Sequence, residues 1–184
     1  MEKITLTCPS VAEVEEFFFP KGNRLQKFLN LSPKTDYWSR PRVLKFLKEN
    51  LHIFKEGQTV ELVVNSLEKE FSKYSSTFDY KQLVDFLNNL GLRKAPLWVP
   101  FAMRMKYADK KKGEDSQIIF VLDPIPLEVD EYYTFSIGNH EKKGPGIGLF
   151  LLAEQPVQPK LAKELKLDLK WKDMRNFYKW AYCA

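Results

Sequence analysis

The chain has 184 residues, of which 44% are hydrophobic and 14% aromatic, so it can bury a core as one large domain or two small ones. This composition is not that of a disordered chain. Lys and Arg (29) outnumber Asp and Glu (24), and the resulting net charge of +5 is compatible with a nucleic-acid partner without requiring one.

The two cysteines, Cys8 and Cys183, lie near opposite ends of the chain, a spacing that fits neither a disulfide framework nor a metal site. We expect two unpaired thiols, the alternative being a disulfide that joins the two ends. No apolar run approaches the roughly 20 residues that cross a bilayer. The first 20 residues are acidic ahead of their short apolar stretch, unlike a secretory signal. A cytoplasmic protein without a membrane span is therefore expected.

Helical periodicity dominates the first 95 residues. Ser10 is expected to cap a short helix with acids in its early turns, and Pro20 and Gly22 are expected to end it. Gly91 provides a stop for another helix. Further helices are predicted over 23–31, 39–54, 59–74 and 78–92.

Beyond Pro96 the apolar residues alternate with a period of two, which is typical of strands. The first expected hairpin joins two strands through a lysine-rich turn over 108–116. A second strand pair is joined by a glycine-rich loop. The expected strands are 98–107, 117–123, 131–137, 147–153 and 164–171, followed by a terminal helix over 171–182.

These elements predict an α+β fold. We expect a mainly helical part over 1–95, followed by a mainly antiparallel β part with a C-terminal helix over 96–184, either as two domains or as one compact unit. The order of elements over roughly 40–123 resembles the architecture of a winged helix, in which the third helix enters the major groove and the hairpin turn follows the phosphates. The alternatives are a protein-interaction domain of that shape, or a helical bundle that precedes a sheet.

Positive charge concentrates in residues 21–48, which contain eight Lys and Arg residues and the single acid Asp36, with aromatic residues between them. Arg42, Lys45 and Lys48 recur in steps of three and form a stripe on a helix. Such a stripe with nearby aromatic rings suits a phosphate backbone and unstacked bases. The alternative is the solvated side of an ordinary amphipathic helix.

Gly144, Gly146 and Gly148 recur at every second position directly after a lysine pair, a spacing that raises the question of a phosphate-binding loop. A dinucleotide loop leads from a strand into a helix, whereas a strand is expected here after the glycines, and the Gly-Lys-Ser/Thr ending of a P-loop is missing. We therefore predict a hairpin turn that offers Lys142 and Lys143 as basic contacts.

No catalytic signature accompanies His52, within the helix expected over 39–54, or His140, in an expected polar loop. Four acids near expected strand ends could hold a divalent cation, which would make the chain a metal-dependent nuclease, but the lysine that such sites use is missing from the strand. This is the less favoured interpretation. The acids are Asp123, Glu128, Asp130 and Glu131.

The favoured hypothesis is a non-catalytic nucleic-acid-binding protein, and the alternative is a non-catalytic protein-interaction or assembly module. No cofactor, metal or catalytic residue is expected. The predicted nucleic-acid contacts are Arg24, Lys27, Trp38, Arg40, Arg42, Lys45, Lys48, Lys81, Lys110, Lys111, Lys112, Lys142 and Lys143.

Overall fold

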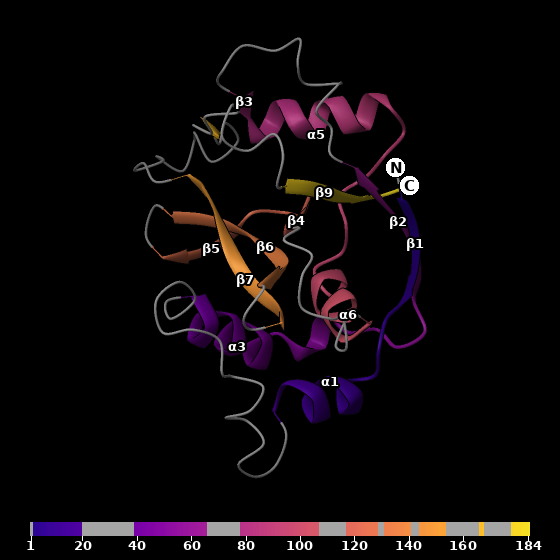
Figure 1. Cartoon of the computed structure of the whole chain (residues 1–184), viewed down its shortest axis with the longest axis vertical. Helices are drawn as coiled ribbons and strands as arrows, with labels where there is room; N and C mark the ends of the chain where they lie inside the picture. Colours follow the sequence, from indigo (N-terminus) through magenta and orange to yellow (C-terminus); the bar gives the residue numbers. More distant parts are fainter. Residues whose placement is uncertain are drawn as a thin grey trace.

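The computed structural model describes residues 2–19, 39–65, 78–106, 117–128, 131–140, 144–153, 166–167 and 178–184. Within these ranges the chain has an α+β fold built on a mixed seven-stranded sheet, with helices packed around it (Figure 1). The α+β expectation is thus confirmed, although the sheet is mixed and not purely antiparallel.

The large sheet has the order β1–β2–β9–β4–β6–β5. Strands β4 and β5 pair with different parts of the same edge of β6, and β7 pairs with the opposite edge. Among the strands that the structure describes in this sheet, β4 and β9 pair in parallel and the other neighbours are antiparallel. The strands are β1 (Glu2–Thr7), β2 (Thr59–Asn65), β4 (Gln117–Phe120), β5 (Ile125–Glu128), β6 (Glu131–His140), β7 (Gly144–Ala153) and β9 (Tyr178–Cys183). A separate two-stranded sheet joins β3 (Phe78–Asp79) to β8 (Lys166–Leu167).

The helices lie at two ends of this sheet. Figure 1 shows α1, α3 and α6 gathered at one end and α5 at the other, beside β3. Their bounds are α1 (Val11–Phe18), α3 (Ser39–Glu49), α5 (Tyr80–Asn89) and α6 (Val99–Lys106), and a 3-10 turn, η1, spans Leu51–Ile53.

Elements with local signals form as expected. Ser10 begins α1 with a capping box, in which its hydroxyl accepts from the Glu13 amide at 3.3 Å and the Glu13 carboxylate accepts from the Ser10 amide at 2.8 Å. Helix α3 begins at Ser39, and Gly91 follows α5 with a φ of 73°. The glycine-rich segment forms the predicted hairpin, because β6 and β7 pair from Tyr132 to His140. The expected helix over 23–31, with Pro20 and Gly22, lies outside the described residues.

The helix predicted over 59–74 is wrong in its first part, since residues 59–65 form β2. Leu62, Val63 and Val64 are all buried, and β2 lies between β1 and β9. A strand covered on both faces has a continuous apolar run instead of an alternating one, so its spacing imitates that of a helix. Strand β1, which pairs with β2 along its whole length, was not among the predicted elements.

The strand predicted over 98–107 is also wrong, because residues 99–106 form helix α6. All six residues from Val99 to Arg104 are buried, so the helix lacks the polar face that marks a helix in a sequence. The winged-helix expectation fails with it: the first strand of the wing is a helix, and β4 pairs with β6 and β9 instead.

The predicted C-terminal helix is wrong over residues 178–182, which belong to β9. Trp180, Ala181, Tyr182 and Cys183 are all buried, because β9 is an inner strand between β2 and β4. The rest of that expected helix lies outside the described residues. Of the strand predicted over 164–171, the structure describes only β8.

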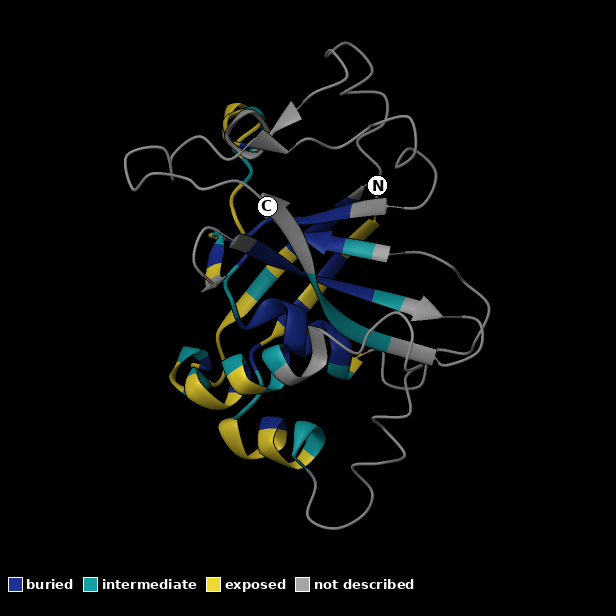
Figure 2. Cartoon of the chain, turned by 90° about the vertical axis from the view of Figure 1, so that its left-hand side faces the viewer, coloured by how far each residue is buried: buried dark blue, intermediate teal, exposed yellow. Residues whose placement is uncertain are grey.

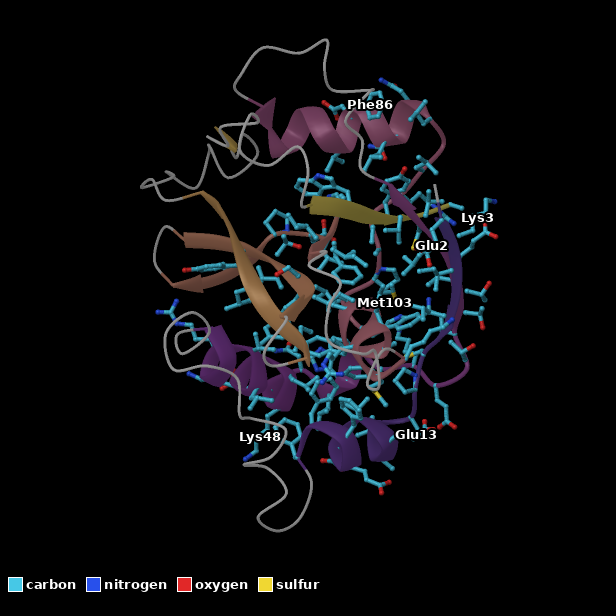
Figure 3. All side chains as sticks on the ribbon, in the orientation of Figure 1. Glu2, Lys3, Glu13, Lys48, Phe86 and Met103 are labelled. Carbon is cyan, nitrogen blue, oxygen red and sulfur yellow. The ribbon has the colours of Figure 1, made fainter. Side chains whose placement is uncertain are left out.

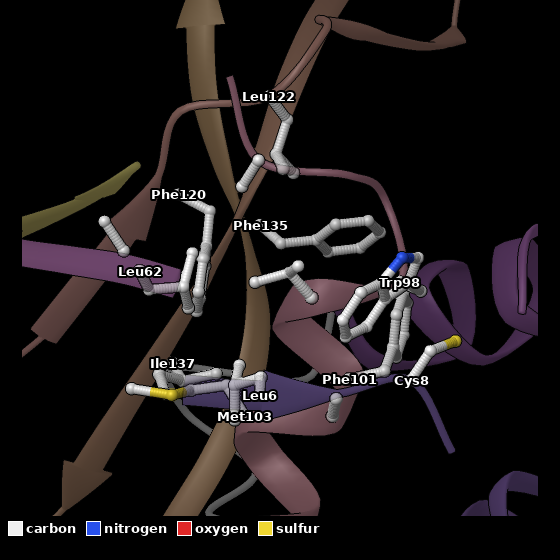
Figure 4. Packing of buried hydrophobic residues seen from close by; sticks show 14 of the residues in the cluster. Leu6, Cys8, Leu62, Trp98, Phe101, Met103, Phe120, Leu122, Phe135 and Ile137 are labelled. Carbon is white, nitrogen blue, oxygen red and sulfur yellow. The ribbon is translucent and has the colours of Figure 1, made fainter. Parts of the chain in front are cut away.

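The core lies between the sheet and α6 (Figure 2). Phe101 of α6 makes edge-to-face ring contacts with Phe18, Phe54 and Phe135 at centroid distances of 5.7, 6.0 and 4.9 Å. Figure 4 shows Phe101 and Phe135 in this cluster with Trp98. Residues from both halves of the sequence therefore share one core, while the division into domains stays a prediction.

Cys8 and Cys183 are both buried and free, as expected for unpaired thiols. The two cysteines lie beside different positions of the chain. The amide of Cys8, just after β1, donates to the Gln58 carbonyl. Cys183 of β9 pairs with Leu62, four residues further along the chain.

Candidate nucleic-acid interface

Helix α3 carries the only predicted contacts whose side chains the structure describes. Its apolar side is fixed in the core, where Val43 and Leu47 are 1% and 0% exposed. Phe46 packs edge to face on Phe135 of β6 at 5.3 Å between ring centroids. The helix also contacts β7. Burial of these side chains sets which side of α3 faces water.

Lys45 and Lys48 lie on the outer side of α3. The Lys45 side chain is 75% exposed, and its ammonium lies 3.9 Å from the carboxylate of Glu49, one turn later. Lys48 is exposed as well, and Figure 3 shows it pointing away from the sheet. A pair between exposed side chains is weak and readily exchanged, so Glu49 does not prevent Lys45 from meeting another anion.

Arg42, the third member of the predicted stripe, points elsewhere. It is half-buried, and its Nη1 donates to the hydroxyl of Tyr133 on β6 at 3.3 Å. Around an α-helix, Arg42 lies about 40° from Phe46 whereas Lys48 lies about 160° from it. The predicted stripe therefore winds around α3 from the sheet side to the water side.

Two other predicted contacts have a described main chain. Arg40 lies in the first turn of α3. Lys81 lies in α5, at the opposite end of the sheet from α3 in both Figure 1 and Figure 2, so these two helices do not form one surface. Outside the described residues lie Arg24, Lys27, Trp38, Lys110, Lys111, Lys112, Lys142 and Lys143.

The acidic cluster is only partly described. The Asp123 carboxylate accepts from the ammonium of Lys94 at 2.7 Å. Glu128 and Glu131 pair across β5 and β6, and Asp130 lies outside the described residues. Among the residues that the structure describes, no group of three or more His, Cys, Asp or Glu side chains is arranged to hold a metal ion.

The histidines do not lie where the sequence placed them. His52 is exposed in η1, after α3 has ended. His140 is the last residue of β6 and pairs with Gly144, so it belongs to the hairpin and not to a loop. The β6–β7 pairing extends further than the sequence predicted, because both strands continue to this turn.

Two polar contacts at this end of the fold were not predicted. Tyr133 was assigned only to a strand, and nothing in its local sequence points to Arg42, which lies 91 residues earlier. Arg104 is 7% exposed, and its guanidinium lies 5.3 Å from the centre of the Phe17 ring. The sequence does contain a signal for the contact of Arg104: a charged side chain within an otherwise apolar segment is expected to need a partner.

None of the helices in the described part of the chain combines the length and the apolar character that a membrane crossing requires. Comparisons with protein-family models, with curated proteins and with solved structures found no match for this chain.

Proposed function

We propose that this protein binds nucleic acid without catalysing a reaction, and that the outer side of α3 contacts the phosphate backbone. The observation that carries the proposal is the exposure of Lys45 and Lys48 on a helix whose opposite side is fixed in the core. The basic segment 21–48, which includes α3 except for its last residue Glu49, contains six further Lys and Arg residues and one acid.

The anchoring of α3 favours binding because the two ammonium groups are carried by a rigid element. Val43 and Leu47 fix the helix, so an approaching phosphate does not have to order the main chain. Each lysine that neutralises a phosphate also releases a condensed counterion, which makes the binding constant fall as salt rises. An interaction of this type depends on charge and requires no base readout by the lysines.

The direct test is fluorescence anisotropy with labelled single-stranded and duplex DNA and RNA, between about 50 and 200 mM salt. The variant is Lys45→Ala/Lys48→Ala. Its matched control is Lys3→Ala/Lys94→Ala, which removes the same charge from two exposed ion pairs away from α3.

For duplex DNA we expect the slope of log K against log salt to become shallower by about 1.8 in the α3 variant, which is about 0.9 for each lysine. The control is expected to keep the wild-type slope. Failure of the wild-type protein to bind at low salt would refute the proposal. Equal effects of the two double variants would remove α3 as the contact. A protein partner that co-purifies at high salt, without nucleic-acid binding, would favour the interaction module instead.

A further inference from the structure

Two contacts between α3 and β6 are in register. Arg42 reaches Tyr133, and Phe46 reaches Phe135. Four residues along a helix advance about 6 Å, and two residues along a strand advance about 7 Å. Residues 133 and 135 also share one face of the strand, because side chains alternate. The spacing of the two elements therefore matches at both contacts.

The two contacts are different in kind. The Phe46 and Phe135 rings make an apolar contact, which tolerates a rotation or a shift of the helix. The bond from Arg42 to the buried Tyr133 is directional and requires the guanidinium to approach one hydroxyl oxygen. Of these two contacts, the polar one fixes how far α3 is rotated about its axis.

The rotation of α3 decides where Lys45 and Lys48 point. Both lysines lie within six residues of Arg42 on the same continuous helix, so a change in its rotation moves both ammonium groups. A half-buried guanidinium that already donates to Tyr133 is also less accessible to a phosphate than the 75% exposed Lys45 side chain.

We propose that Arg42 is a positioning residue: Val43 and Leu47 turn one side of α3 toward the core, and the bond from Arg42 to Tyr133 then limits the remaining rotation of the helix so that Lys45 and Lys48 are presented to phosphates. Arg42 itself contacts no phosphate. This inference rests on the proposed function of α3. It revises the role of Arg42, which the sequence alone groups with the phosphate contacts.

The test measures duplex-DNA affinity and its salt dependence for three variants of the full chain. Arg42→Met removes the charge and the donors but keeps a long apolar side chain. Tyr133→Phe removes the acceptor and leaves every charge in place. Lys45→Met is the matched control, because it removes one charge from the same helix with the same substitution. Circular dichroism confirms that each variant is folded at the assay temperature.

We expect Arg42→Met and Tyr133→Phe each to weaken binding by about two- to tenfold, the equivalent of one hydrogen bond. The salt slope should stay unchanged, because the bound helix regains the same rotation and Lys45 and Lys48 make the same phosphate contacts. The combined variant is expected to lose less affinity than the sum of the two single losses, since both changes remove the bond between Arg42 and Tyr133. Lys45→Met is expected to make the slope shallower by about 0.9. A purely structural role for Arg42 would lower thermal stability and leave the affinity of the folded protein unchanged.

The outcomes separate the two proposals. If wild-type protein binds and Arg42→Met reduces the slope as much as Lys45→Met does, Arg42 is a phosphate contact and the positioning role is wrong. Unchanged or tighter binding by Tyr133→Phe would also overturn it. Absence of binding by the wild-type protein refutes the proposed function, and the positioning role falls with it.

Discussion

Replacement of Thr134 by Val tests how the chain joins two strands to one edge of β6. Strand β4 pairs with β6 as far as Ile119 and Ser136, and β5 resumes pairing with β6 at Ile125 and Tyr133. Thr134 lies between these positions. Its hydroxyl donates to the Phe120 carbonyl at 2.6 Å, and Thr134 is 0% exposed.

Valine has nearly the shape of threonine, so this change creates no cavity but removes the donor. The Phe120 carbonyl then loses a hydrogen bond where water cannot replace it, because Phe120 is also 0% exposed. Loss of a partner for a buried polar group costs about 1–3 kcal/mol of unfolding free energy. In a chain of this length the melting temperature should fall by about 2–12 °C.

Urea unfolding and differential scanning calorimetry measure both quantities. Thr5→Val is the matched control, since Thr5 is an exposed threonine on strand β1. Its change should stay within about 0.5 kcal/mol, as for other surface substitutions. If Thr134→Val is no more destabilising than Thr5→Val, the buried hydroxyl contributes nothing to this junction and the reasoning is wrong.

Four further predictions concern local features. Ser10→Ala should destabilise the fold by about 1 kcal/mol in urea unfolding through loss of the cap. The amide and hydroxyl of Ser10 hold the pKa of Glu13 below its ordinary value of 4.5. Glu13→Gln should therefore lower the urea midpoint at pH values above 4.5, and this effect should vanish as the pH falls through the lowered pKa of the folded protein. Gly91→Ala should cost about 1–2 kcal/mol, because Gly91 has a φ of 73° and only its conformation resists a side chain, and Gly91→Asn should cost less in the same assay. Burial raises the pKa of the Cys8 and Cys183 thiols, so alkylation near neutral pH should be slow until urea exposes them; rapid labelling of the native protein would contradict their burial.

The sequence predicts which lysines of the candidate site are exposed. It does not predict that Arg42 differs from them in its surroundings. The spacing of Lys45 and Lys48 relative to Val43 and Leu47 predicts that both lysines face water, as the structure has them. The position of Arg42 could not be read in this way. It depends on a tyrosine 91 residues later in the chain, which enters the surroundings of α3 only when β6 is in place.

The sequence by itself determined the elements whose signals are local. Ser10 caps α1, Gly91 stops α5, and the glycines of β7 permit a hairpin without a helix after it. Each of these depends on residues within a few positions of one another, so no distant partner is needed to form it.

Only the tertiary structure decided the nature of β2, α6 and β9. Residues 62–64 of β2, 99–104 of α6 and 180–183 of β9 are all buried, so over these stretches the apolar pattern loses the contrast between a wet and a dry face that separates period two from period 3.6. Leu62 pairs with both Ile4 and Cys183, which lie 58 and 121 residues away in the sequence. A strand whose neighbours are that distant is specified by the packing of the whole sheet, because its own residues are compatible with either conformation.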